Sequence, residues 1–457
     1  MVNVTTISVE DLEQSVRAAL ETQDEDTLRT AIADVHFPDL ADLLERLGPD
    51  LAPQVFRLFS DQEKTDVLHE LGVDATRNLL EQLPADEIAA LLNQMPMDDA
   101  AEIFTEDVPE RQEELLSQMH PADAAEVRTL LQYPPESAGR LMTEKYVRLE
   151  ADMSVEAAIA SLRRVNSEVE TITDMYVLDK DDYLIGALSL RELITASPGS
   201  RIRAIMSSPV VSVTAETDRE DVARLVARYD FLAMPVVDDD KHMLGVITVD
   251  DILHVLVEEG TEDALKFGAV EGGVINQPYF TVPIHRVIRS RVGWLLLLFV
   301  AETLTGTVLR LFEVQLAEVV ALSFFIPLLI GTGGNTGAQT VSTIIRGLAL
   351  KEIKLSDSLR VIRRELFSGF LLGLLLGVVA FFRTILWGGL DLAFCLVIAL
   401  TILAICTWAN TIGSIIPLLA QRFKIDPAVV SAPLITTLVD ATGLAIYMLI
   451  AIAILHI

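Results

Sequence analysis

Hydrophobic residues are distributed unevenly along this chain of 457 residues. Up to about residue 290, apolar and polar positions alternate at short intervals, as they do in soluble domains. From about residue 292 onward the chain is dominated by apolar runs, each with roughly the 20 residues that a membrane-spanning helix needs. The pattern therefore predicts a multidomain protein with a soluble N-terminal part and a helical membrane part.

Residues 40–131 carry an internal repeat. An apolar residue recurs every twelve positions, at Leu44, Phe56, Leu68, Leu80, Leu92, Phe104 and Leu116. A second one follows three positions later, at Leu47, Phe59, Leu71, Leu83, Met95 and Met119, with Val108 in place of Asp107. Such a unit predicts a two-turn helix and a corner, and it buries its apolar edge only by stacking on its neighbours. We expect an acidic α-helical repeat domain over residues 1–140, built as a short solenoid.

A second repeat follows the first. LMTEKYVRLEAD (141–152) aligns with IMSSPVVSVTAE (205–216), and MYVLDKDDYLIGALSLRELI (175–194) aligns with MPVVDDDKHMLGVITVDDIL (234–253). Each copy predicts a strand, a helix, two strands joined by a turn, and a helix, which indicates two α/β units over 141–199 and 200–257. The copies resemble a tandem pair of CBS domains.

The second copy contains a candidate nucleotide site. Gly245, Thr248 and Asp251 match a pattern in which, in nucleotide-binding CBS pairs, the aspartate holds the ribose hydroxyls. The resemblance thus implies that Thr248 and Asp251 could bind an adenine nucleotide such as ATP. A helix N-cap at Thr248 is the alternative.

The C-terminal part predicts a five-span α-helical membrane domain over 291–457, with spans near 292–312, 317–345, 365–386, 392–419 and 427–455. A connecting helix and linker over 258–290 precede it. Eleven basic residues flank these spans on the side of the soluble part, against two, Arg310 and Arg383, on the other. Because positive charges favour the cytosol, we expect cytosolic N-terminal domains and an outside C-terminus. No positively charged segment followed by an apolar one opens the sequence, so we also expect no cleaved signal peptide.

Charge and cysteine content narrow the functional classes. The formal net charge is −31, and only nine of the 66 acidic residues lie beyond residue 283. A soluble part this acidic repels nucleic acid and attracts cations, although many of these acids serve only a solvated surface. Cys395 and Cys406 lie eleven positions apart in one apolar segment, about 16 Å along a helix, and are interpreted as packing residues.

Asp440 interrupts the last apolar run. It lies thirteen residues after Pro427, or about 20 Å along a helix, which places it within the hydrocarbon core. Polar and small residues form one stripe along this span, at Pro433, Thr436, Thr437, Asp440 and Gly443. The span contains no lysine or arginine. A charge at that depth is costly and usually functional. Either another span or a passing cation neutralises it, or the carboxyl is protonated between helices.

Two other spans carry small or polar residues. IGTGGNTGAQTVS (330–342) places glycine, threonine, asparagine and glutamine at membrane depth, where they are tolerated only against protein or water. Gly369, Gly373 and Gly377 recur at four-residue spacing, which allows helices to approach closely.

Taken together, the chain resembles the MgtE-type magnesium channels over nearly its whole length. The resemblance is carried by GTGGNTGAQ (331–339), EEGTEDA (258–264), IDPAVVS (425–431) and PLITTLVDATG (433–443). It implies a homodimer in a bacterial-type cell (inner) membrane, with an ion path on the twofold axis lined by spans two and five. Asp440 would be the filter residue, with Thr436 and Asn335 along the path. The activity implied is import of Mg²⁺ down its electrochemical gradient.

The resemblance also implies that cytosolic Mg²⁺ closes the path by binding between acidic soluble domains and the connecting helix, which would act as a plug. The metal-ligand candidates, besides Asp440, are Asp98, Glu102, Asp218, Glu220, Asp230, Asp250, Asp251, Glu258, Glu259, Glu262, Asp263 and Asp426. Ala432 and His254 depart from the pattern, since some relatives carry a polar residue and an acid there.

Other functions fit parts of the sequence. A receptor for Mg²⁺ or nucleotide without transport would leave the polar faces of spans two and five unexplained. An ion-coupled secondary carrier for Mg²⁺, Co²⁺ or Mn²⁺, regulated by nucleotide at the CBS pair, is the alternative to a channel. A membrane metalloprotease would need a motif such as HExxH. His456 is the one histidine beyond residue 285, so an enzyme of this kind is excluded.

Overall fold

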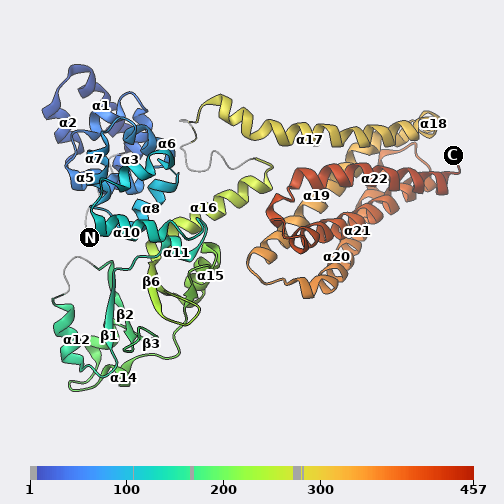
Figure 1. Ribbon diagram of the computed structural model, residues 1–457. Helices are drawn as coiled ribbons and strands as arrows, with labels where there is room; N and C mark the ends of the chain where they lie inside the picture. Colours follow the sequence, from blue (N-terminus) through green and yellow to red (C-terminus); the bar gives the residue numbers. More distant parts are fainter. Residues whose placement is uncertain (1–7, 107, 165–168, 271–278, 280–281) are drawn as a thin grey trace. The chain divides into compact units, whose positions relative to one another are not determined.

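The computed structural model describes residues 8–106, 108–164, 169–270, 279 and 282–457 (Figure 1). The chain divides into two compact units, one formed mainly by residues 1–259 and one by 260–275 and 283–457. Asp107 and residues 271–278 and 280–281 of the predicted linker lie outside the described residues.

The first unit begins with short helices. They are α1 (Val9–Thr22), α2 (Glu25–Ile32), α3 (Phe37–Leu47), α4 (Ala52–Phe56), α5 (Asp61–Glu70), α6 (Val73–Leu80), α7 (Ala85–Leu92), α8 (Met97–Glu106), the 3₁₀ turn η1 (Pro109–Arg111), α9 (Gln112–Leu116) and α10 (Pro121–Leu130). Alternate helices pack on each other, so that α1, α3, α5, α7 and α9 form one row and α8 packs on α10. This stacking confirms the expected helical repeat.

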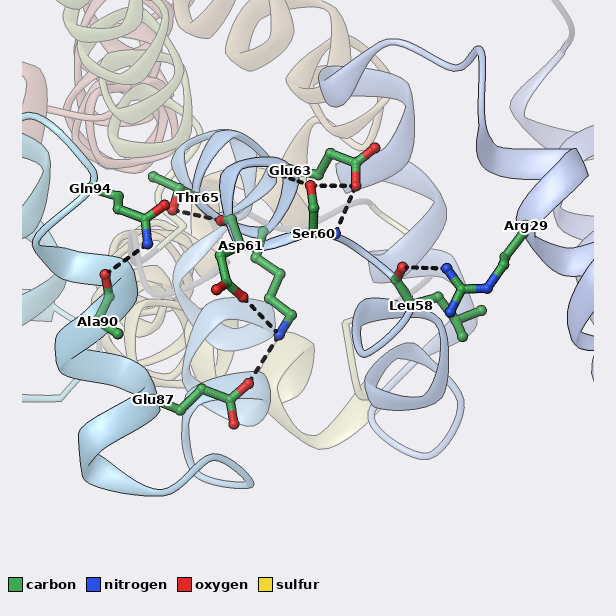
Figure 2. Close-up of polar contacts among 10 residues, drawn as sticks. Arg29, Leu58, Ser60, Asp61, Glu63, Thr65, Glu87, Ala90 and Gln94 are labelled. Carbon is green, nitrogen blue, oxygen red and sulfur yellow. Dashed lines mark hydrogen bonds and ion pairs between the residues drawn. The ribbon is translucent and has the colours of Figure 1, made fainter.

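The residues of the twelve-residue repeat form the core of these helices. All thirteen predicted apolar positions are buried, from Leu44 to Met119, and so is Val108. Local polar contacts cap the starts of α1, α2 and α5, as Figure 2 shows for α5. Ser60 and Glu63 form a capping box, with the Ser60 backbone N–H donating to Glu63 Oε2 at 2.7 Å. Such a cap satisfies backbone donors that a helix leaves unpaired.

Two three-stranded sheets follow. The first contains β1 (Tyr146–Glu150), β2 (Thr171–Leu178) and β3 (Leu184–Ser189), and the second contains β4 (Val213–Thr214), β5 (Ala233–Val237) and β6 (Met243–Thr248). In each sheet the first two strands are parallel and the last two antiparallel. The accompanying helices are α11 (Ala138–Leu141), α12 (Val155–Leu162), α13 (Leu190–Thr195), α14 (Ile202–Ile205), α15 (Arg219–Tyr229) and α16 (Val249–Phe267). This order confirms the predicted pair of α/β units.

The two copies exchange their leading segments. Thr143, ahead of β1, pairs with Val246 of β6, and Ser207, ahead of β4, pairs with Ala187 of β3. Glycine is required beside each crossing. A Cβ on Gly245 would lie 2.6 Å from the Thr143 carbonyl oxygen, and one on Gly186 would lie 2.4 Å from Met206 Sδ. The pair is therefore one interlocked module, whose second copy shares a core with the helical repeat.

The second unit is helical. After the end of α16 it contains α17 (Ile284–Leu311), α18 (Glu313–Glu318), α19 (Ala321–Ala349), η2 (Leu355–Asp357), α20 (Ser358–Trp387), α21 (Leu392–Arg422), η3 (Pro427–Val429) and α22 (Ala432–Leu455). Helices α19, α21 and α22 supply most of its buried core.

Among the described residues, four segments are long and apolar enough to cross a membrane: Ile284–Leu311, Leu355–Trp387, Leu392–Arg422 and Ala432–Leu455. The sequence predicts five. Helix α19 is 29 residues long but is not one of the four, because its GTGGNTGAQT stretch is too polar. The fifth span is therefore not established by hydropathy.

The glycines of α20 allow it to pack closely on α21, as predicted. Cβ atoms on Gly369, Gly373 and Gly377 would each lie 2.8 Å from backbone atoms of α21. No side chain fits at such a distance without a backbone shift. Cys395 and Cys406 are both free and buried, which confirms their role as packing residues.

Candidate ion-binding sites

The first candidate site lies where α22 packs on α19. A Cβ atom built on Gly334 would lie 3.2 Å from Thr436 Cγ2 and 3.7 Å from Asp440 Oδ1. Neighbouring glycines make this approach possible, since a Cβ on Gly337 would lie 2.9 Å from Ile435. The structure thus brings the polar stripe of α22 against the glycine-rich segment of α19.

Asp440 is half-buried and makes no ion pair or hydrogen bond with any residue that the structure describes. Thr436 is half-buried too, and its hydroxyl donates to the Pro433 carbonyl at 2.9 Å, while Asn335 is exposed in the single chain. A carboxylate that lacks a basic partner in apolar surroundings keeps its charge only if a cation or water reaches it.

The start of α22 is held by α17. Trp294 Nε1 of α17 donates to Ser431 Oγ, the N-cap residue of α22, at 3.1 Å. Ahead of it, Asp426 Oδ1 accepts a hydrogen bond from the Ala428 N–H at 2.8 Å and so caps η3. These contacts fix the segment that leads into the Asp440 helix.

The second candidate site is an acidic cavity of about 550 Å³ in the first unit. Its lining includes Asp98, Glu102, Asp251 and Glu258 from the predicted set, together with Asp99. Asp98 is only 9% exposed, and its Oδ1 atom has no hydrogen-bond partner among the described residues. Since a buried polar atom is normally paired, this oxygen is a candidate cation ligand.

Burial and mutual repulsion perturb these carboxyls. Burial, with the nearby charges of Asp99, Asp251 and Glu170, raises the pKa of Asp98 well above its ordinary value. Burial likewise raises the pKa of Asp251 to about 7, against the hydrogen bond that Thr248 Oγ1 donates to Asp251 Oδ2 at 2.8 Å. A divalent cation here would relieve the cost of bringing these acids together.

His69 was not predicted as part of this cavity. Its Nδ1 atom lies 3.1 Å from Asp99 Oδ2, and this hydrogen bond raises the pKa of His69 to about 9. The His69 ring also meets that of His254, with centroids 5.9 Å apart. No spacing in the sequence links His69 to Asp99, because they lie on different repeat units.

Arg219 neutralises the acids at the start of the predicted connecting helix. Its guanidinium lies 3.2 Å from Glu258 Oε2 and 3.0 Å from Glu259 Oε1, and it also pairs with Glu136. Burial lowers the pKa of Arg219, but the charges of the three glutamates outweigh it and raise that pKa above its ordinary value. No motif or spacing in the sequence singles out this arginine.

Lys266 neutralises two further acids at the end of α16. Its ammonium lies 2.8 Å from Glu262 Oε1 and 2.8 Å from Asp426 Oδ2. Burial lowers the pKa of Lys266, but the hydrogen bonds to Asp426 and Glu262 outweigh it and raise that pKa above its ordinary value. Four predicted metal ligands are therefore paired with basic side chains of the protein itself.

The remaining predicted ligands lie apart from these groups or have local partners. Asp218 caps α15 by accepting from the Glu220 N–H at 2.9 Å, and Glu220 pairs with Arg224 at 3.0 Å. Asp230 ends α15 and is exposed, as is Asp250, while Asp263 is half-buried on α16. Within the described ranges, no three histidine, cysteine, aspartate or glutamate side chains converge to hold a metal ion.

The fold and these sites define a class of protein. A CBS pair and a helical repeat precede a bundle of membrane-length helices. In this bundle a carboxylate that has no basic partner among the described residues meets a glycine-rich helix. This is the arrangement of a multi-pass membrane transport protein with soluble regulatory domains.

Comparison with known families identifies the class further. Family models match as the MgtE intracellular N domain over residues 35–136, CBS domains over 138–199 and 202–258, and the MgtE divalent cation transporter over 326–450. The chain is 40% identical over 445 residues to the magnesium transporter MgtE of Thermus thermophilus, covering 97% of this chain and 98% of that protein. It is 37% identical to the magnesium transporter MgtE of Bacillus subtilis over 341 residues, 75% of this chain and 74% of that one.

The chain belongs to the MgtE family of magnesium transporters, which confirms the resemblance and the prediction that it is not an enzyme. Its soluble part is also similar to a solved structure. The cytosolic domain of the Mg²⁺ channel MgtE in complex with ATP is 36% identical, with a TM-score of 0.50, covering 53% of this chain and 99% of that one.

Proposed function

We propose that this protein is a Mg²⁺ channel that imports Mg²⁺ along a path lined by α19 and α22. The observation that carries the proposal is the Asp440 carboxylate, which faces Gly334 of α19 and lacks a basic partner among the described residues. The names of the relatives support Mg²⁺ as the transported ion.

The path requires α19 to cross the membrane as a fifth span. Its buried face contains Gly333, Gly334 and Gly337 and packs on α21 and α22, so its polar residues need not face lipid. With five spans, the soluble domains lie in the cytosol and the C-terminus outside, as the distribution of basic residues predicts.

The chain acts as a homodimer in this proposal. A twofold axis beside α19 and α22 presents each residue twice, so one Asp440 per chain becomes a pair of carboxylates. Mg²⁺ gives up its water reluctantly and is usually bound by one or two carboxylates, with several waters retained. Asp440 would hold the hydrated ion, with Thr436 and the exposed Asn335 along its route. A membrane potential of 100 mV supplies a dication with about 4.6 kcal/mol, so no ATP hydrolysis is needed.

Cytosolic Mg²⁺ closes the channel in this proposal. In the acidic cavity, Asp98 Oδ1 has no partner among the described residues, and burial together with repulsion between neighbouring acids raises the pKa values of Asp98 and Asp251. A bound divalent ion would offset both effects. Shifting a switch from 1:99 to 99:1 takes about 5.5 kcal/mol of differential binding. Glu102, Asp218, Glu220, Asp230, Asp250 and Asp263 would contribute further charge, and α16, as connecting helix, would carry the change to the pore.

Nucleotide binding at the CBS pair is a subsidiary proposal. It is supported by the ATP complex of the related cytosolic domain. Thr248 and Asp251 would hold the ribose, but in the structure their side chains bond to each other at 2.8 Å. Binding would therefore have to break this contact.

The test is ion flux into liposomes containing the full-length protein. Wild type and Asp440→Ala are compared with Mg²⁺, Mn²⁺, Co²⁺ and Ca²⁺ outside, with and without Mg²⁺ on the side of the soluble domains. We expect Mg²⁺ flux that Mg²⁺ on that side suppresses, and none through the variant. Flux that requires a proton or Na⁺ gradient would instead indicate a coupled carrier.

A further inference from the structure

Lys266 occupies a position where the resemblance to the MgtE family implies a metal ion. Its Nζ atom lies 2.8 Å from Glu262 Oε1, one turn earlier on α16, and 2.8 Å from Asp426 Oδ2, which is 160 positions away in the chain. The Lys266 side chain is 28% exposed and the two carboxylates 35% and 42%. One cation therefore bridges two acids from separate elements.

The Asp426 carboxylate is fully engaged. While Oδ2 accepts from Lys266, Oδ1 accepts from the Ala428 N–H at 2.8 Å. This second bond caps η3, and Ser431, the N-cap of the Asp440 helix, follows two residues after η3 ends. Lys266 is thus bonded to the segment that positions α22.

The next residue reinforces this attachment. Phe267 packs against the buried core of the helical unit, to which α19, α21 and α22 contribute. The end of α16 is therefore attached to this unit by an apolar contact and a salt bridge, both made by the chain itself.

We propose that Lys266 is a tethered cation that fills the Glu262–Asp426 carboxylate pair and competes with divalent cations for it. An ammonium and a metal ion cannot share these oxygens, because they would be like charges only a few ångströms apart. A divalent ion can bind Asp426 only after Lys266 leaves. Lys266 thereby raises the cation concentration at which this pair binds metal. Its effect on gating rests on the proposed function, but its effect on metal binding does not.

The test uses Mn²⁺, whose binding to the purified full-length protein is followed by its electron paramagnetic resonance signal. Lys266→Gln and Lys266→Met remove the charge in two different ways, and Lys266→Arg keeps it. Both neutral variants should bind one more Mn²⁺ per chain, or bind it about tenfold more tightly, which corresponds to 1.4 kcal/mol. Lys266→Arg and Lys180→Gln, which removes an exposed lysine of the β2–β3 turn, should match wild type.

A double variant assigns the gained ion to this pair. Lys266→Gln with Asp426→Asn should lose the gain. The variants should fold, because partly exposed ion pairs contribute little to stability, and a single symmetric size-exclusion peak checks this.

Unchanged Mn²⁺ binding in both neutral variants would overturn the proposal, as would a gain that survives Asp426→Asn. Flux is measured in parallel, and Lys266→Gln should lower the cytosolic Mg²⁺ concentration that half-closes the channel. A Mn²⁺ gain without any Mg²⁺ inhibition of flux, even in wild type, would refute the proposed gating and leave the role of Lys266 as a competitor intact.

Discussion

Asp440 and the acids of α16 differ in whether a basic side chain neutralises them. Asp440 has no basic partner among the described residues, although it lies in an apolar helix where an ion pair would be most valuable. The helix α16 precedes the membrane helices, and a charged side chain in contact with water needs no counter-charge. Arg219 and Lys266 nevertheless neutralise three of its acids, Glu258, Glu259 and Glu262. On the proposed function, the difference separates a carboxylate that is available to a passing ion from carboxylates that hold an element in place.

The cavity around Asp98 is a third case. Its acids lie in the soluble part, and only some of them are paired. Asp98 Oδ1 has no partner among the described residues, while Asp99 pairs with His69. Availability to an external cation therefore varies along the chain, and each case can be tested by substitution.

The largest effect should come from Asp440. Asp440→Asn keeps the side-chain size but removes the charge, and we expect Mg²⁺ flux to fall about 100-fold or more, as losing about 3 kcal/mol of ion stabilisation implies. Glu302→Gln removes another acid that interrupts an apolar run of the sequence. Glu302 lies on α17 and is exposed. This substitution should leave flux within about threefold of wild type. Equal losses in the two variants would remove the distinction between Asp440 and other membrane acids.

The next effect separates assembly from ion passage. Gly373→Leu places a Cβ 2.8 Å from Leu403 Cα and carbonyl oxygen, so α20 and α21 must move apart. We expect a loss of about 3 kcal/mol or more, seen as a fall in melting temperature and yield in detergent. Gly306→Leu is the matched control, because a Cβ there meets nothing within 4 Å. A stable, well-assembled Gly373→Leu protein would contradict the packing described.

Much of the fold could be predicted, because it repeats. The twelve-residue period identified the buried face from Leu44 to Met119. The aligned CBS copies predicted the succession of strands and helices along the chain. The spacing of Gly369, Gly373 and Gly377 predicted a close helix–helix contact, and the structure shows that the partner is α21. Each is a local or periodic signal that the sequence carries directly.

The pairing of charges could not be predicted in the same way. Glu262 and Lys266 stand four residues apart on one helix, which is a readable signal. Asp426, however, meets Lys266 only through the fold. Arg219 meets Glu258 and Glu259 across about 40 positions, and His69 meets Asp99 across 30. The number of spans is a further case, since the polar residues of α19 lower its mean hydropathy below that of the four candidate spans.

A smaller effect is expected from pH. Between about pH 4 and 7 the folded protein keeps protons on Asp251 that the unfolded chain has released, because its pKa rises from 3.8 to about 7. Without divalent ions, the stability of the first unit should therefore fall as pH rises through this range. His69, whose pKa is raised from 6.5 to about 9, adds a loss of the same sign above pH 6.5.

The measurement is amide hydrogen exchange of α8 and α16 in the full-length protein, corrected for the intrinsic effect of pH. From pH 5 to 8 we expect opening to become at least tenfold more frequent, since each pKa unit by which a group differs between the folded and the opened state represents 1.36 kcal/mol. Millimolar Mg²⁺ should suppress the change, and Asp98→Asn with Asp251→Asn should remove the part of it below about pH 6.5, leaving the contribution of His69. A pH dependence indifferent to both would mean that these acids do not form a cation site.

The smallest effect should come from Arg219. Arg219→Gln leaves Glu136, Glu258 and Glu259 without their counter-charge, and we expect a loss of about 1 kcal/mol, limited by solvent screening. Arg224→Gln, on the same helix, removes only pairs with Glu220 and Asp221 and should cost a few tenths of a kcal/mol. Urea unfolding of the two variants, followed by a probe on α16, compares them. If Arg219→Gln lost no more stability than Arg224→Gln, the ion pairs of Arg219 would not stabilise the position of α16.

The position of a bound ion in the membrane helices tests the central claim most directly. Crystals of the full-length protein grown with Mn²⁺ in place of Mg²⁺ would show the ion by its anomalous scattering. We predict a peak between two symmetry-related Asp440 carboxylates, bound directly or through one water, that is absent from Asp440→Asn crystals. No ion there, with Asp440 paired to a basic side chain or packed in dry hydrocarbon, would contradict the account.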